Sequence, residues 1–231
     1  MFRAGAGKMG LRRLKINAGG SQRQASGFSL LEMMIVVALT ITVSLFAVLS
    51  LVPVMNQQRV TNAYNTTMAA MRQARDNAVS QRTSYSVTFS SSITPNTIVV
   101  APTLAGFQGD QNTATYQLPP GVTFLAQSAL SSTPPPDGYG TGMAAMDFGY
   151  PSPGTGSGGQ TVVYFCPDGS AQNSSGAGTC AGMNNWSGGV VYIARSGDVL
   201  SSRAITLWGG TGRIHGWRLY NNGGGYQWLR Q

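Results

Sequence analysis

Charged side chains are scarce in this chain, at 10% of its 231 residues, against roughly 25% in an average soluble domain. Histidine is scarcer still, because His215 is the only one. A His-rich metal site is therefore excluded, and a Ser-His-Asp triad would depend on that single residue. No G-x-x-x-x-G-K-[ST] phosphate loop occurs either. These absences predict a protein that is not an enzyme and that needs neither a cofactor nor a metal.

The basic residues are unevenly distributed. Lys and Arg number 15 against 7 Asp and Glu, but both lysines and four of the arginines precede residue 27. From Phe28 onward, nine arginines face seven acids. The excess charge therefore belongs mainly to the N-terminal leader and says little about binding partners.

A long apolar run follows this leader. Between Phe28 and Met55 the only charge is Glu32, and the 23 residues from Met33 to Met55 carry none. At roughly 1.5 Å per residue they can cross about 30 Å of hydrocarbon, so residues 28–55 are predicted to form a transmembrane helix. The basic flank places residues 1–27 in the cytoplasm by the positive-inside rule.

Glu32 is the exceptional residue of this run. A carboxylate in an apolar helix costs several kcal/mol unless it has a partner, so it is a candidate functional residue. The alternative is that it snorkels to the headgroup boundary at the nearby helix end. No A-x-A-like cleavage site follows the run, so we expect the helix to be retained as an anchor.

The segment RQASGFSLLEMMI at residues 23–35 resembles the class III signal of type IV pilins and pseudopilins. The resemblance implies that a prepilin peptidase cuts between Gly27 and Phe28, so that the cytoplasmic leader 1–27 is removed, and methylates the new amine of Phe28. It also implies that Glu32 pairs with the Phe28 ammonium of a neighbouring subunit.

The helix is expected to continue beyond the membrane as an amphipathic segment over residues 56–82, bent by Pro53. Apolar residues recur there at helical spacing, at Val60, Tyr64, Met68, Met71 and Ala78. This stripe predicts that the second half of the helix packs on a folded domain.

Residues 83–231 are predicted to form a β-rich domain of short strands separated by Pro, Gly and Ser clusters. We predict an α+β fold, with the long N-terminal helix packed on an antiparallel sheet. Strands are expected at 85–89, 97–101, 122–125, 161–165, 189–194, 204–207 and 214–220, and residues 131–159 are expected to form one long surface excursion. Cys166 and Cys180, the only cysteines, predict a disulfide in an oxidising compartment, with two free thiols as the alternative.

A second resemblance covers roughly residues 160–220. The runs at 163–170, 189–193 and 203–207, with Gly212-Arg213-Ile214 after them, are similar to the strand series of the GspH/FimT group of minor pilins. This similarity implies the pilin fold and an inner-membrane protein with a periplasmic domain. It also implies a structural subunit that assembles with other pilins or pseudopilins, through an assembly platform, into a type IV pilus or a type II secretion pseudopilus.

The last 37 residues hold five arginines, interleaved with aromatic residues. Some FimT-like proteins bind DNA through a Gly-Arg-x-Arg element, which makes Arg213, Arg218 and Arg230 candidate DNA contacts. This chain departs from that element at its fourth position, His215. We favour the interpretation in which the arginines pair with acidic loops or another subunit, and in which the tryptophans belong to the core or an interface.

His215 itself is expected to be a surface or hydrogen-bonded strand residue. A membrane-tethered envelope enzyme that uses Ser or Asp residues around His215 is the remaining rival function.

Overall fold

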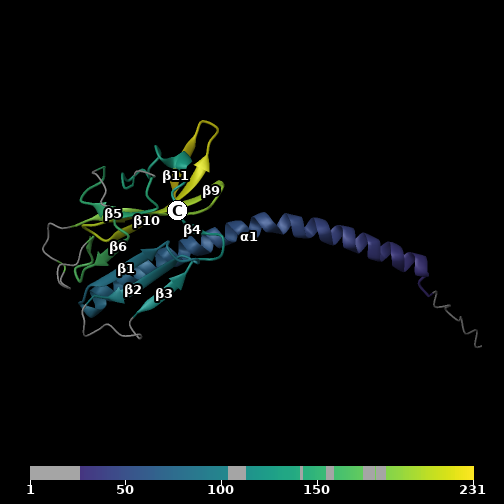
Figure 1. Ribbon diagram of the computed structural model, residues 1–231, viewed down its shortest axis with the longest axis horizontal. Helices are drawn as coiled ribbons and strands as arrows, with labels where there is room; N and C mark the ends of the chain where they lie inside the picture. The colour runs from purple at the N-terminus through teal and green to yellow at the C-terminus, as the bar shows by residue number, and fades with distance from the viewer. Residues whose placement is uncertain (1–26, 104–112, 141–142, 155–158, 174–179, 181–185) are drawn as a thin grey trace, which may run out of the picture. The chain divides into compact units, whose positions relative to one another are not determined.

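The computed structural model describes residues 27–103, 113–140, 143–154, 159–173, 180 and 186–231, and the chain divides into two units, 1–49 and 50–231 (Figure 1). Helix α1, Leu30–Gln81, runs through both. The prediction that the helix ends near Arg82 is confirmed. Arg82 itself adopts a positive φ of 52°, a left-handed conformation that commonly closes helices.

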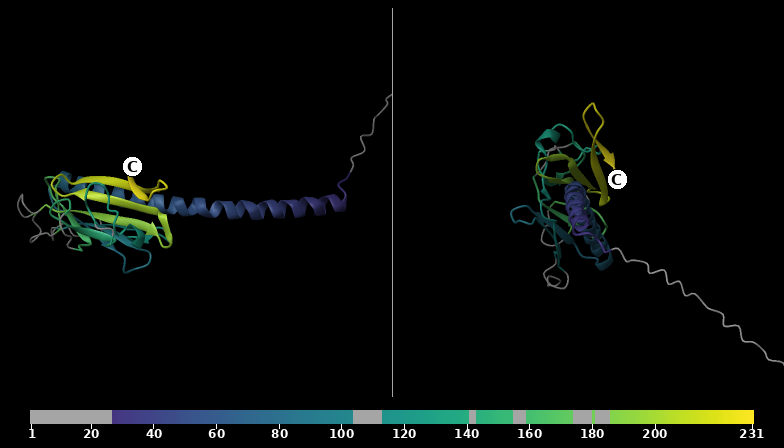
Figure 2. Two further views of the ribbon diagram at one scale, coloured as in Figure 1. Left: turned by 90° about the horizontal axis from the view of Figure 1, so that it is seen from above. Right: turned by 90° about the vertical axis from the view of Figure 1, so that its right-hand side faces the viewer.

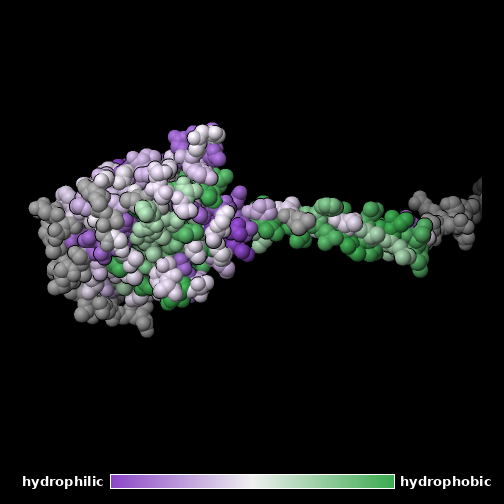
Figure 3. All heavy atoms as spheres, turned by 45° about the horizontal axis from the view of Figure 1, so that its top comes forward, coloured by the Kyte–Doolittle hydropathy of each residue, from purple (hydrophilic) through white to green (hydrophobic). Residues whose placement is uncertain are grey.

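The first unit contains most of the apolar part of α1, which continues to Met55 in the second unit. Its large apolar side chains are exposed along the helix, as the green surface in Figure 3 shows. The hydroxyls of Thr42 and Ser44 bond to the carbonyl oxygens of Leu39 and Thr40, at 2.8 and 2.7 Å, so the helix satisfies its own polar groups. As predicted, the helix is long and apolar enough to span a membrane.

In the second unit, α1 packs on the folded domain through the predicted stripe, and all five of its residues are buried. Small residues complete this face, because Ala63, Ala70 and Ala74 are fully buried as well. Their size lets the helix backbone approach the strands closely.

Two antiparallel sheets lie against this half of α1 (Figure 2). The order of the first is β3-β2-β1-β6-β7, formed by β1 (Tyr85–Ser90), β2 (Thr97–Pro102), β3 (Ala114–Gln117), β6 (Val162–Phe165) and β7 (Ala171–Gln172). The order of the second is β11-β10-β9-β8-β4, formed by β4 (Thr123–Phe124), β8 (Gly188–Arg195), β9 (Asp198–Trp208), β10 (Arg213–Asn221) and β11 (Tyr226–Arg230). The predicted α+β class and the seven expected strands are confirmed.

The core has two parts. The larger one lies between α1 and both sheets, and the second lies on the other face of the second sheet. Trp217 and Trp228 are buried in this second part, as the prediction of core tryptophans requires. Trp186 and Trp208 are exposed.

The prediction of residues 131–159 as one surface excursion is wrong for much of that segment. Strand β5 (Met146–Tyr150) pairs with β8, and Phe148, Tyr150 and Tyr139 are buried. The segment covers the outer face of the second sheet, and its Pro and Gly content concealed a strand of only five residues. Residues 141–142 and 155–158 of this prediction lie outside the described residues.

The disulfide prediction is confirmed. Cys166 and Cys180 are bonded, with their Cα atoms 5.6 Å apart. The bond joins the end of the β6 region to residue 180 across a sequence separation of 14.

Candidate functional site

The residues of the predicted processing and assembly site lie at the start of α1. Gly27 and Phe28 precede the helix and Glu32 occupies its first turn. All three are exposed, so a peptidase or a neighbouring helix can reach them. Cleavage, methylation and the pairing of Glu32 with another subunit stay predictions.

A basic groove lies between α1 and the start of β10. Strand β11 pairs with β10 only from Trp217 to Asn221, and the Gln231 N–H donates to the Gly216 carbonyl oxygen. The edge from Arg213 to His215 is therefore not covered by β11. Two adjoining cavities of about 700 and 400 Å³ follow this edge. We call them together the basic groove, which is lined by four arginines, Arg72, Arg75, Arg213 and Arg230, and by His215.

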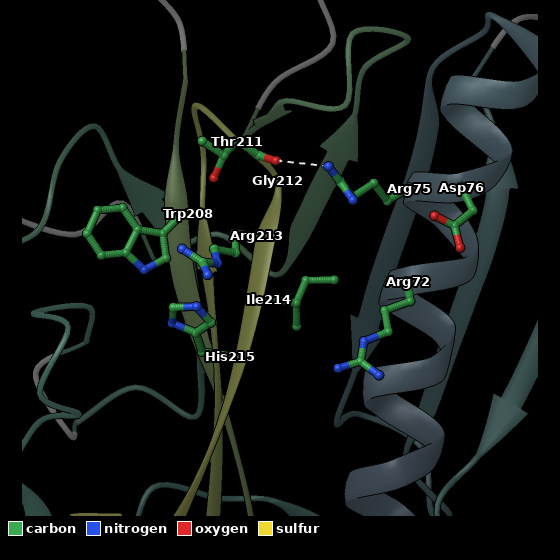
Figure 4. A pocket seen from close by; sticks show the side chains of 9 residues that line it. All are labelled: Arg72, Arg75, Asp76, Trp208, Thr211, Gly212, Arg213, Ile214 and His215. Atoms are coloured by element: carbon green, nitrogen blue, oxygen red, sulfur yellow. Dashed lines mark hydrogen bonds between the residues drawn. The ribbon is translucent and has the colours of Figure 1, made fainter. Parts of the chain in front are cut away.

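Arg75 connects helix α1 to two turns at one end of this groove. Its Nε donates to the carbonyl oxygen of Gly169 at 3.2 Å. Its Nη2 donates to the carbonyl oxygen of Thr211, also at 3.2 Å (Figure 4). The helix is thereby tied to the turn after β6 and to the turn before β10. Gly212 adopts a φ of 58° beside this clamp, where a Cβ would overlap the Gly169 carbonyl oxygen. The Gly-Arg pair of the sequence is thus a tight turn that sets the position of Arg213.

His215 borders the groove and contacts the segment that covers the sheet. Its Nδ1 lies 3.6 Å from the Asp137 carboxylate. That carboxylate also accepts hydrogen bonds from Thr206 Oγ1 and, at 3.4 Å, from Trp208 Nε1. Asp137 therefore fastens the covering segment to the second sheet.

The ring of His215 is only partly satisfied. Its side chain is 12% exposed, and Nε2 is buried without a hydrogen-bond partner in the described part of the chain. Burial, with a further contribution from Arg230, lowers the pKa of His215, although Asp137 opposes that shift. His215 is therefore a strand residue of β10, as expected, but its Nδ1 approaches Asp137 only to 3.6 Å and its Nε2 has no hydrogen-bond partner among the described residues.

The structure separates the three arginines that the sequence grouped as candidate DNA contacts. Arg213 and Arg230 line the basic groove, whereas Arg218 lies in a separate cavity opposite Arg203 of β9. Among the described residues none of these arginines forms an ion pair with an acid, and the acidic side chain of Asp137 lies beside His215 instead.

Sequence reasoning missed Arg72 and Arg75 as site residues. Both belong to the polar faces of the amphipathic helix. Their spacing of three residues sets them one turn apart, beside the buried stripe. The sequence therefore indicates that the two arginines lie together on the helix, but it does not indicate that they face Arg213 across the groove.

No family model, curated protein or solved structure matches this chain. The function of the groove therefore rests on its own chemistry. Four arginines face one lining carboxylate, Asp76, and an exposed Trp208 stands at one end. Guanidinium groups bind phosphate or carboxylate through paired hydrogen bonds, so the groove suits an anion.

Proposed function

We propose that this protein is a GspH/FimT-type minor pilin or pseudopilin, a structural subunit of a type IV pilus or a type II secretion pseudopilus. One observation carries the proposal. Gly27-Phe28 stands directly before a continuous helix that is apolar and exposed in its first half and packed on an antiparallel domain in its second. Glu32 lies in the first turn of that helix.

The helix explains how such a subunit would work. Its apolar half would hold the subunit in the inner membrane, with the domain in the periplasm, until assembly. In a filament the same apolar surface would pack against neighbouring helices, where Glu32 would need a cationic partner to offset desolvation. The amine of Phe28 of a neighbouring subunit, freed by a prepilin peptidase, would supply that charge.

The N-terminus of the mature protein tests the proposal. Mass spectrometry of the protein purified from membranes is expected to find Phe28, methylated, as the first residue. Gly27→Leu should leave the leader attached, whereas the matched leader substitution Gly20→Leu should not. An uncut leader, or a cut at another bond, would contradict the pilin assignment.

Assembly is a separate test. Glu32→Gln should be processed normally, because it changes no residue of the cleaved bond, and yet it should be lost from the sheared filament fraction. A Glu32→Gln subunit that assembles like the wild type would remove the assigned role of this carboxylate.

The basic groove favours a second candidate function, binding of DNA by a FimT-like minor pilin. The supporting observation is that Arg72, Arg213 and Arg230 line one groove without an ion pair in the described chain. Phosphate contacts of this kind make affinity fall steeply with salt.

Filter retention of double-stranded DNA by the full chain in neutral detergent tests this candidate. Arg213→Ala should weaken retention and flatten its salt dependence, and Arg218→Ala, which removes the same charge outside the groove, should not. Equal effects of the two variants, or no retention at low salt, would rule out the groove as a DNA site.

A further inference from the structure

A second cluster of positive charge lies outside the basic groove. Arg203 of β9 and Arg218 of β10 stand directly opposite each other in the antiparallel register, so both side chains lie on one face of the sheet. Arg203 is only 5% exposed. Like charges that face each other across a strand pair repel, so this arrangement lacks an obvious structural benefit.

The described part of the chain does not neutralise this arginine pair. Asp198 lines the same cavity, but it makes no ion pair with either guanidinium, and its Oδ1 accepts the backbone N–H of Ser201. Burial and the neighbouring Arg218 lower the pKa of Arg203 to about 10. A bound anion would offset both the desolvation of the Arg203 charge and its repulsion by Arg218.

The two guanidinium groups are held in position and retain N–H donors that could bind an anion. Arg203 Nη1 donates to the carbonyl oxygens of Ser201 and Ser202, each at 3.1 Å. Its Nε and Nη2 make no hydrogen bond within the described residues. The Arg218 guanidinium lies 5.1 Å from the centre of the Tyr220 ring, a cation–π contact that fixes its position.

The cavity beside this pair has a volume of about 290 Å³ and is also lined by Gln57 and Val60 of α1. The helix turn just before them, 51–55, exposes its apolar side chains. At roughly 1.5 Å per residue, Gln57 and Val60 lie about 3 and 8 Å beyond Met55 along the helix. The polar layer of a bilayer is roughly 5 to 8 Å deep on each side, so these two helix residues of the cavity would be at headgroup depth if the apolar run up to Met55 spans the membrane upright.

Two exposed side chains at the cavity suit the same environment. Leu200 and Tyr220 line it and are 49% and 40% exposed. Tyrosine concentrates at membrane interfaces, where its ring contacts the apolar layer and its hydroxyl remains in contact with water.

We propose that Arg203 and Arg218 bind the phosphate of an anionic phospholipid, with Leu200 and Tyr220 against the apolar boundary below it. The site would steady the domain on the membrane before assembly. This inference rests on the membrane anchoring of the proposed function. A carboxylate of a neighbouring subunit would offer the same charge, but the depth of the cavity and its exposed apolar rim favour a lipid.

Lipid retention by the full chain tests the inference. The protein in neutral detergent is titrated with phosphatidylglycerol or phosphatidylcholine, and bound lipid is counted by native mass spectrometry. Phosphatidylglycerol should be retained preferentially, and Arg218→Gln should weaken its binding roughly five- to tenfold. The matched control Arg213→Gln removes the same charge from the basic groove and should leave retention unchanged.

Arg203→Lys supplies a second variant at the buried position. It keeps the charge but loses the fork of donors, and its thermal unfolding is compared with that of the wild type to confirm folding. A folded Arg203→Lys protein should also bind the lipid more weakly.

Three outcomes would overturn the inference. They are wild-type retention by Arg218→Gln, an equal loss in Arg213→Gln, and displacement of the lipid by inorganic phosphate at equal concentration. If Arg218→Gln kept wild-type lipid retention but lost filament assembly, the pair would be assigned to a subunit contact. Because Arg218→Gln should still be cut before Phe28, a failed lipid test in correctly processed protein leaves the proposed function standing.

Discussion

Replacement of Gly212 by alanine should destabilise the protein more than replacement of any glycine in an open turn. Gly212 has a φ of 58°, which costs an L-residue about 1 to 2 kcal/mol. A Cβ there would also overlap the Gly169 carbonyl oxygen and lie 2.9 Å from Arg75 Nε. Overpacking of this kind typically costs about 1 to 3 kcal/mol. Together the two terms predict a loss of about 2 to 5 kcal/mol in the free energy of unfolding.

Gly223→Ala is the matched control for this substitution. Gly223 has a φ of 82°, and no atom lies within 4 Å of the place that an alanine Cβ would take, so only the backbone cost applies. Urea unfolding of the full chain in neutral detergent, followed by tryptophan fluorescence, measures both variants. Gly212→Ala should be the less stable by about 1 to 3 kcal/mol. Equal losses would refute the contact between the Gly212 turn, Gly169 and Arg75.

Three further predictions concern the domain. Replacing Cys166 and Cys180 by serine should lower the free energy of unfolding by about 3 kcal/mol, because the unfolded loop is no longer closed. Reductant should lower the midpoint of thermal unfolding of the wild type and leave that of the double variant unchanged. Since burial lowers the pKa of His215, the unfolded state binds the proton more readily, so stability should fall as pH drops through about 6.5; His215→Gln should flatten this part of the profile measured by urea unfolding. Met71→Ala, at a fully buried position of α1, should cost about 2 to 5 kcal/mol in the same assay, whereas the exposed Asn62→Ala should change stability by under about 0.5 kcal/mol.

Much of the fold could be predicted because its signals are local. The spacing of Val60, Tyr64 and Met68 predicts a buried helical stripe, and α1 buries it. The longer β-rich runs likewise form strands. Strand β5 escaped prediction because it is short and lies among Pro and Gly residues, and because its stability comes from pairing with β8 rather than from its own composition.

The candidate site could be predicted only in part. The tail arginines stand out in the composition, but alternation along β10 sends Arg213 and Arg218 to different surfaces. Arg72 and Arg75 join Arg213 only because α1 packs across the open edge of that strand. No pattern within either segment encodes that juxtaposition.

The sequence by itself determined the apolar helix, the place of Glu32 in its first turn, the cysteine pair available for a disulfide and the β-rich character of the rest. Each of these follows from neighbouring residues and from the periods of helix and strand. Tertiary structure alone decided which arginines share a surface. Charges meet across elements only after packing has fixed the register of the strands and the face that the helix presents, and both depend on contacts between residues far apart in the chain.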